Sequence, residues 1–112
     1  VIADIDPLLA DTHAFEELRL LSQLSSRTTT LKENDVVLLR RIIGGSGTGP
    51  ASRLGLDPEV CRANPQEVSR AAFAAAQHWR RRAEHPLNDP FTTRACRAAV
   101  RSAEALLAEF RA

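Results

Sequence analysis

The chain has 112 residues, of which 44% are hydrophobic, 26% are charged and 4% are aromatic, and its formal net charge is +1. This length suits a single domain that buries its own core without disulfides or metal ions. The charged fraction and the near-neutral balance argue against intrinsic disorder and against a protein devoted to electrostatic capture of nucleic acid. Because Met and Tyr are absent, the core must consist mainly of Leu, Val, Ile and Ala.

The first helix is expected over about residues 7–25. Asp6-Pro7 is a favourable start, because Asp accepts amide hydrogen bonds at an N-cap and Pro has no amide that needs a partner. Apolar residues then recur at three- and four-residue steps, which predicts a buried stripe. Its members are Leu8, Phe15, Leu18, Leu21 and Leu24, with Ala14 beside them. The polar run at 25–30 ends the helix.

A second helix is expected over about residues 32–43. Thr30 and Glu33 have the spacing of a capping box, and Gly44-Gly45 supplies a stop. The run VVLLRRII between them is also compatible with a strand, because it is rich in β-branched residues. Two adjacent arginines, the lack of a hairpin partner and the two end signals favour the helix.

The glycine-rich segment 44–56 is expected to be a flexible connector, with a tight turn at 53–56 that holds two leucines against the core. Its first part, GGSGTG, invites comparison with loops that bind phosphate. Pro50 and Ala51 follow where a P-loop requires Lys and then Ser or Thr, and no preceding strand is predicted. An anion site therefore stays only as the alternative interpretation.

The third main helix has the clearest signals. Asp57-Pro58 first predicts a short helical turn, and Asn64-Pro65-Gln66-Glu67 then gives an N-cap, a proline at N1 and a glutamate at N3. We expect the helix to end near Glu84, because Pro86 lacks a helix donor and restricts the residue before it. Trp79, the only tryptophan, should lie inward among alanines.

The last helix is expected to start at Asp89-Pro90. Its predicted buried face comprises Cys96, Ala99, Val100, Ala103, Leu106, Leu107 and Phe110. The sequence therefore predicts an all-α fold, an antiparallel helical bundle of about four main helices with a short extra turn. We expect one helical domain over 1–112, with a first helix pair at 1–43, the connector at 44–56 and a second helix pair at 57–112.

No arrangement of residues predicts catalysis, and we expect no catalytic residue, no cofactor and no metal. The histidines are too scattered for zinc spacing, and Cys61 and Cys96 lack the C-x-x-C pattern. Cys96 falls on an apolar stripe, where a thiol usually behaves as a small hydrophobe. Glu16 and Glu17 are adjacent, so they point in different directions on a helix and make no acid/base pair.

The cytoplasm is the expected location, with a peripheral position at a membrane as the alternative. The longest apolar run is far shorter than the ~20 residues of a membrane-spanning helix, and no signal peptide is visible. The sequence begins at Val1 without methionine, so it can be a fragment of a longer protein.

A basic ridge around the loop between the last two helices is the best candidate for an interaction surface. An arginine triplet ends the third helix and three further arginines follow in the fourth, and guanidinium groups pair well with phosphate and carboxylate. The solvated end of a helix is the simpler interpretation of the triplet. The candidate residues are Arg80, Arg81, Arg82, His85, Arg94, Arg97 and Arg101.

From Arg53 onward the chain resembles the C-terminal segment of actinobacterial dynamin-like GTPases of the isoniazid-inducible type. The likeness lies in R-L-G-L at 53–56, W-R-R-R-A-E-H-P-L at 79–87 and R-S-A-E at 101–104, and I-D-P-L-L-A-D-T-H-A-F-E-E-L-R at 5–19 is compatible with the same region. The resemblance implies that the nucleotide site lies in another part of a longer protein. This segment then supplies packing, assembly or regulation to a membrane-remodelling machine.

The chain is also similar to the J-domain. The matching positions are Leu54-Gly55-Leu56, Glu67-Val68, Ala71, Trp79, Val100, Ala103 and Leu107. The H-P-D tripeptide is absent, because His85-Pro86 is followed by Leu87. This resemblance therefore implies a degenerate helix pair that docks onto a protein, not an activator of a chaperone ATPase.

The sequence predicts a non-enzymatic helical module for protein interaction or assembly. Its expected partner is another protein or the rest of its own longer chain. The alternatives are the degenerate J-like docking domain and a weak binder of nucleic acid or anionic membrane that uses the arginine ridge. The oligomeric state is left open.

Overall fold

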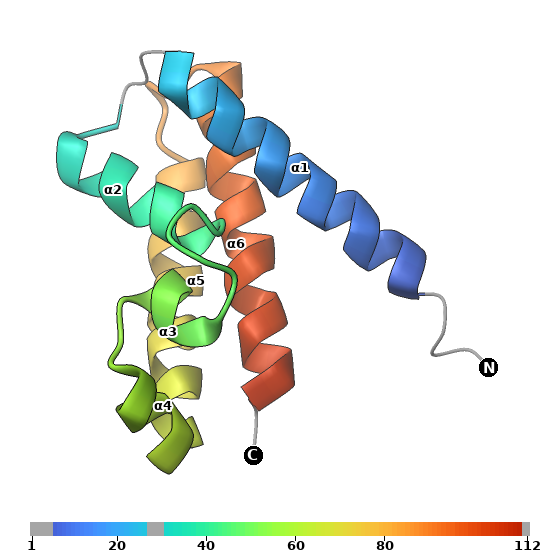
Figure 1. Cartoon of the computed structure of the whole chain (residues 1–112). Helices are drawn as coiled ribbons and strands as arrows, with labels where there is room; N and C mark the ends of the chain where they lie inside the picture. Colours follow the sequence, from blue (N-terminus) through green and yellow to red (C-terminus); the bar gives the residue numbers. More distant parts are fainter. Residues whose placement is uncertain (1–5, 27–30, 111–112) are drawn as a thin grey trace.

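The computed structural model describes residues 6–26 and 31–110, and for residues 6–11, 25 and 26 it describes the helical backbone alone. This part of the chain forms six helices and no strand, which confirms the all-α prediction (Figure 1). The helices are α1 (Asp6–Ser26), α2 (Glu33–Ile42), α3 (Pro50–Leu54), α4 (Pro58–Ala63), α5 (Pro65–Ala83) and α6 (Pro90–Phe110).

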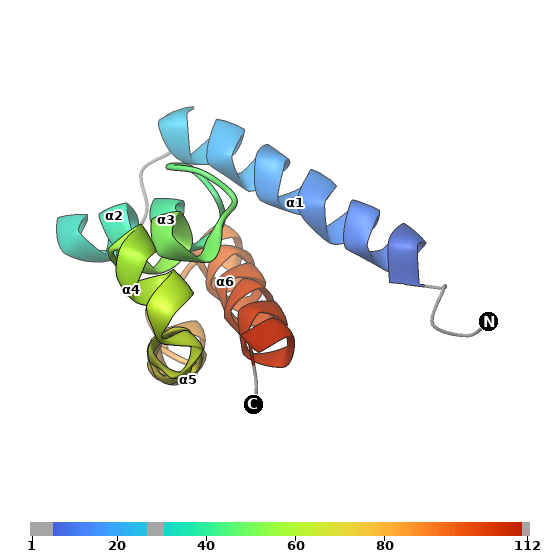
Figure 2. The same ribbon diagram turned by 60° about the horizontal axis from the view of Figure 1, so that its bottom comes forward.

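Helices α5 and α6 form an antiparallel hairpin around which the other helices are arranged (Figures 1 and 2). Small side chains line their seam and allow the two backbones to approach closely. These fully buried alanines are Ala72 and Ala76 of α5 and Ala95, Ala99 and Ala103 of α6. Trp79 is 2% exposed and is the largest buried side chain, which confirms its predicted inward position.

The helix starts that the sequence predicted for the hairpin are confirmed. Asp57 Oδ1 accepts a hydrogen bond from the Glu59 amide at 2.8 Å and begins α4, the predicted short turn. Asp89 Oδ1 accepts one from the Thr92 amide at 2.7 Å and begins α6. Asn64 stands at the N-cap of α5 as predicted, although its side chain makes no capping hydrogen bond.

Helix α2 is helical and not a strand, and its Leu39 and Ile42 are buried against the core. The predicted capping box is wrong, because Glu33 is the first helical residue and the extended Lys32 stands at the N-cap. Thr30, the other member of that box, lies outside the described residues.

The glycine-rich connector contains a helix that the sequence did not predict. Helix α3 runs from an N-cap at Gly49 to Gly55, which closes it in the left-handed conformation with φ +70°. A side chain at this φ is strained, so glycine suits the position. Of the two leucines that the sequence placed against the core, Leu54 packs partly buried against it. Leu56 is half-buried and does not belong to the core cluster.

Helix α1 lies obliquely across α6, and its N-terminal half leads away from the hairpin (Figures 1 and 2). The predicted stripe on this helix is wrong for Phe15 and Leu18, which are each 64% exposed. Glu17 is only 6% exposed, and with Leu20 and Leu24 it forms the buried face. The helix is rotated from its predicted orientation because a polar cluster on the body binds Glu17.

Candidate functional site

The structure divides the predicted arginine ridge among several surfaces. Arg80 pairs with Glu104 across the α5–α6 hairpin, and Arg82 Nε lies 3.3 Å from Asp35 Oδ2 of α2. Arg80 thus joins α5 to α6 and Arg82 joins α5 to α2, so both guanidinium groups already have carboxylate partners. Arg81 is exposed on α5.

His85 lies in the loop between α5 and α6 and takes part in local contacts. Its Nδ1 accepts a hydrogen bond from the Leu87 amide at 3.2 Å. In the same loop the Asn88 amide group donates to the Arg82 carbonyl oxygen at 2.5 Å. These bonds fix the shape of the loop.

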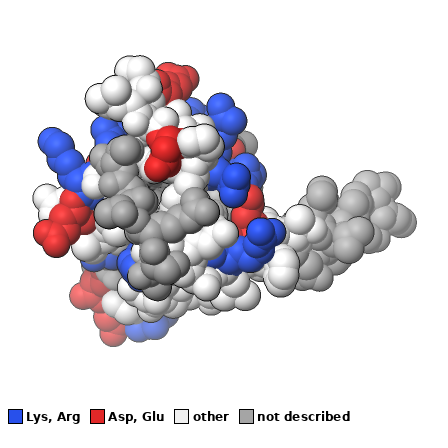
Figure 3. Space-filling view, turned by 90° about the horizontal axis from the view of Figure 1, so that it is seen from above, with Lys and Arg blue, Asp and Glu red and all other residues white. Residues whose placement is uncertain are grey.

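The remaining members of the ridge lie together on one face of α6. Arg94, Arg97 and Arg101 line a shallow groove of about 550 Å³ that also includes Asn88, Pro90 and Thr93. Arg94 in addition lines a hollow of about 260 Å³ together with Glu16, Arg19 and Gln23 of α1. Seen from above, Lys and Arg side chains gather on the side where α1 leaves the body (Figure 3). Arg19 therefore belongs with this face, although the sequence did not single it out.

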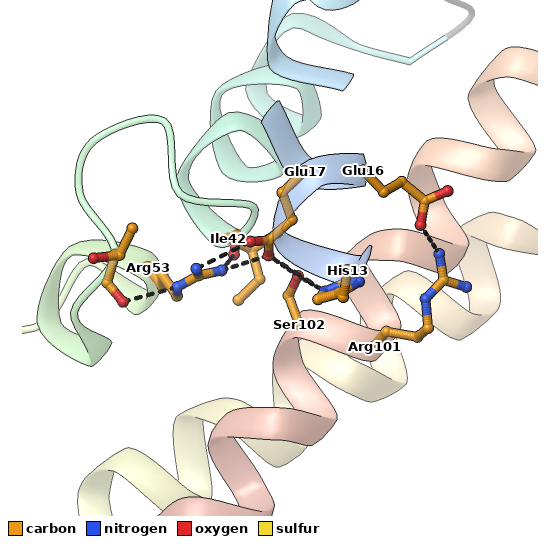
Figure 4. Close-up of polar contacts among 8 residues, drawn as sticks. His13, Glu16, Glu17, Ile42, Arg53, Arg101 and Ser102 are labelled. Atoms are coloured by element: carbon orange, nitrogen blue, oxygen red, sulfur yellow. Dashed lines mark hydrogen bonds and ion pairs between the residues drawn. The ribbon is translucent and has the colours of Figure 1, made fainter. Parts of the chain in front are cut away.

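A second cluster, which sequence reasoning missed, centres on the carboxylate of Glu17 (Figure 4). Arg53 of α3 donates two hydrogen bonds to this carboxylate, from Nη1 to Oε2 at 2.7 Å and from Nη2 to Oε1 at 3.2 Å. Ser102 of α6 donates its hydroxyl hydrogen to Oε2 at 2.5 Å. We call Glu17, Arg53, Ser102 and the neighbouring His13 the polar junction.

Arg53 also ties the glycine-rich loop to the body. Its Nη1 donates to the Ile42 carbonyl oxygen at 2.8 Å, and its Nε donates to the Thr48 carbonyl oxygen at 3.0 Å. One guanidinium therefore holds α1, the end of α2 and the loop before α3. The polar junction thus connects five segments of the chain, which are α1, the end of α2, the loop before α3, α3 and α6.

The environment of Glu17 strongly favours its ionised form. Burial alone would raise its pKa, but hydrogen bonds from His13, Arg53 and Ser102 and the charge of Arg53 outweigh burial and hold the pKa at about 2. A carboxylate at this place is charged at all ordinary pH values, and a buried charge of this kind is tolerated only with such partners.

The polar junction contains serine, histidine and glutamate, but its hydrogen bonds do not make Ser102 a nucleophile. The one hydroxyl hydrogen of Ser102 goes to Glu17, so His13 Nε2, 3.1 Å from Ser102 Oγ, can only donate to that oxygen. A catalytic base instead accepts the hydrogen of the serine and is oriented through its other nitrogen. Ser102 is also 2% exposed. The cluster is arranged to dock helices.

A signal for this cluster was present in the sequence. His13, Glu17, Leu20 and Leu24 follow one another at steps of four, three and four, which places them on one helical face. The apolar stripe through Phe15 and Leu18 indicated a different buried face, and the prediction followed that stripe. Because Glu17 shares this face with Leu20 and Leu24, which are buried, the pattern indicates that its carboxylate is buried too and has polar partners.

A groove opens beside the polar junction where α1 and α6 diverge. It has a volume of about 520 Å³, and its walls include Ala14 of α1 and Ala105, Leu106 and Glu109 of α6. We call it the α1–α6 groove. Phe15 and Leu18 stand on the exposed side of the same helix α1. Small wall residues allow another helix to come close.

The cysteines offer no reactive thiol. Cys61 and Cys96 are both buried and form no disulfide. Burial raises the pKa of Cys96 to about 11, with Arg82 lowering it and Asp35 raising it to lesser extents. The neutral thiol therefore packs as a small apolar group.

Residues 6–26 and 31–110 contain neither a candidate metal site nor a candidate membrane-spanning helix. No group of three or more histidine, cysteine or acidic side chains there is placed to hold a metal ion. None of these helices combines the length and the apolar character needed to cross a membrane.

Two curated proteins match the chain over its whole length. They are the isoniazid-induced protein IniC from two strains of Mycobacterium tuberculosis, CDC 1551 / Oshkosh and H37Rv, and each is 76% identical over 112 residues. The chain spans only 22% of the length of these relatives. No protein-family profile and no solved structure matches it. The chain is therefore similar to one segment of a longer isoniazid-induced protein.

Proposed function

We propose that the chain is a non-catalytic helical interaction or assembly module within a longer dynamin-like GTPase that acts in membrane remodelling. The motifs at 53–56, 79–87 and 101–104 support this assignment, as does the similarity to an isoniazid-induced protein of greater length. In this proposal the nucleotide site lies in another part of the longer protein. The segment itself hydrolyses no GTP.

The observation that carries the proposal is the position of α1. Its N-terminal half leaves α6 (Figure 2). The α1–α6 groove lies on the side of α1 that carries His13, Ala14 and Glu17. On the helix itself Phe15 and Leu18, three residues apart and thus neighbours, are each 64% exposed. Large apolar side chains that lie exposed beside each other on a helix are typical of surfaces that another protein covers. The partner proposed is the rest of the longer chain.

Binding between two purified pieces tests the proposal. We expect the 112-residue chain to form a complex with the remainder of the Mycobacterium tuberculosis relative, measured by titration calorimetry. Replacing Phe15 and Leu18 together by serine should weaken the complex by about tenfold or more, because interface affinity is concentrated in a few apolar anchors.

Leu87→Ser is the matched control. Leu87 is 75% exposed in the loop between α5 and α6, on a different segment from Phe15 and Leu18, so its replacement should leave the affinity unchanged. Two results contradict the proposal. One is the lack of any association between the two pieces, and the other is hydrolysis of GTP by the isolated chain.

A further inference from the structure

The arginine face of α6 is continuous and extends onto α1. Arg94, Arg97 and Arg101 are three and four residues apart, so they follow one face of the helix over about 10 Å. All three are exposed and line the same groove of about 550 Å³. Arg19 of α1 faces the adjoining hollow, which shares Arg94. We call these four residues the arginine face.

The positive charge of the arginine face is only partly balanced by the carboxylates around it. Glu16 pairs with Arg101, and Asp89 uses an oxygen to cap α6. Within residues 6–26 and 31–110, Arg19, Arg94 and Arg97 make no ion pair.

Two other exposed arginines do have local partners. Arg62 pairs with Glu59 at 2.6 Å, and Arg70 pairs with Glu67 at 2.7 Å, each three residues away on its own helix. Like charges at this spacing on α6 repel one another and cost a little stability. An anionic partner removes that repulsion, so the arginine face has the charge of a binding site.

The chemistry of the face favours carboxylates of a protein over the phosphates of a nucleic acid. The net charge of the whole chain is +1, which gives little long-range attraction for a polyanion. Glu16 lines the hollow beside this face, and its carboxylate would repel a continuous row of phosphates. Its pairing with Arg101 shows how this groove holds a carboxylate from a neighbouring helix.

We propose that the arginine face of α1 and α6 binds an acidic helical segment of a protein partner. Carboxylates three and four residues apart on such a helix match the spacing of Arg94, Arg97 and Arg101, and guanidinium groups pair with carboxylates bidentately. The inference rests on the proposed function, since it names the chemistry of one contact that an assembly module makes. It rests mainly on arginines of α6, whereas the proposed function uses Phe15 and Leu18 of α1.

A designed peptide provides the test. The probe is an alanine-based helical peptide of about 20 residues with glutamates at three- and four-residue spacing, labelled for fluorescence anisotropy. The full chain should bind it, and replacement of the glutamates by glutamine should abolish binding. Charge reversal by Arg94→Glu with Arg97→Glu should weaken binding by about tenfold or more. Higher salt should also weaken binding.

Arg62→Glu with Arg70→Glu is the matched control, because it changes the net charge equally on a distant surface, and it should leave binding within about twofold. Arg94→Ala with Arg97→Ala gives a second, milder test if the reversal impairs folding. The inference is overturned if the peptide does not bind, if both double reversals act equally, or if duplex DNA or vesicles containing phosphatidylserine bind more tightly than the peptide.

The two proposals fail in different ways. If the remainder of the relative binds the chain but Arg94→Glu with Arg97→Glu has no effect on peptide binding, the arginine face has no such role and the assembly module stands. If the peptide binds specifically but the remainder does not associate, the arginine face stands and the proposed partner is wrong.

Discussion

Trp79 fills the largest single volume in the core and is 2% exposed between α5 and its neighbours. Trp79→Ala leaves a cavity among alanines that cannot extend to fill it, so we expect a loss of about 3–5 kcal/mol in the free energy of unfolding. Urea denaturation at neutral pH measures it. Phe73→Ala on the same helix should cost no more than about 1 kcal/mol, because Phe73 is 52% exposed. A loss below about 1 kcal/mol for Trp79→Ala would contradict the core position.

Glu17 makes the stability of the protein depend on acid pH. Its pKa is about 2 in the folded chain, below the ordinary value of 4.5. Because the folded pKa is the lower one, ionised Glu17 stabilises the fold above about pH 4.5, and this contribution disappears as the pH falls toward 2. The difference corresponds to about 3 kcal/mol. Urea denaturation at a series of pH values between 2 and 6 measures the loss.

Glu17→Gln tests the origin of this pH dependence. The amide cannot ionise, so the variant should be less stable than the wild type near pH 6 and should approach it as the pH falls to 2. Glu59→Gln is the control, because Glu59 is exposed and paired only with Arg62, and it should keep the wild-type acid curve. Identical acid curves for Glu17→Gln and the wild type would show that the carboxylate of Glu17 is not the responsible group.

Helix boundaries were predictable because their signals are local. Asp57-Pro58, Asn64-Pro65 and Asp89-Pro90 each combine a residue that suits an N-cap with a proline at N1, and the structure begins a helix at each. The alanine and tryptophan pattern also predicted that Trp79 faces inward. In both cases the physical cause lies within a few residues of sequence, so no knowledge of the rest of the fold is needed.

The orientation of α1 was not predictable in the same way. Phe15 and Leu18 give the helix an apolar stripe, but the residue that the body binds is Glu17, through Arg53 from α3 and Ser102 from α6. Those partners are 36 and 85 residues away in sequence. In the proposed function, a further partner covers the exposed stripe of Phe15 and Leu18, and this would explain why apolar side chains occupy it.

The arginine ridge was also only partly predictable from the sequence. The period of three and four residues correctly grouped Arg94, Arg97 and Arg101 on α6. It could not show that Arg80 and Arg82 are engaged by Glu104 and Asp35, because these pairs join different helices. Nor could it place Arg19 beside Arg94, since their proximity depends on how α1 crosses α6.

The molecule as a whole consists of a packed body and one helix held mainly by polar contacts. Its radius of gyration is 14.0 Å, whereas a compact domain of this length has about 13 Å. Among residues 12–24 of α1, Leu20 and Leu24 are buried and Leu21 packs partly buried against the core. The other anchors in this range are the polar junction and the pair between Glu16 and Arg101. The α5–α6 hairpin has a long alanine seam in addition to its ion pair.

These different attachments predict that α1 can be released while the body stays folded. Glu17→Gln combined with Arg101→Gln removes the ionic anchors, and small-angle X-ray scattering should then give a larger radius of gyration than for the wild type. Amide hydrogen exchange should accelerate in α1 and remain slow in α5 and α6. Arg80→Gln with Glu104→Gln removes an ion pair between helices that share an apolar seam, so neither quantity should change. An unchanged radius of gyration and unchanged exchange in the first variant would mean that the apolar contacts of α1, which include Leu20, Leu21 and Leu24, suffice to hold it in place.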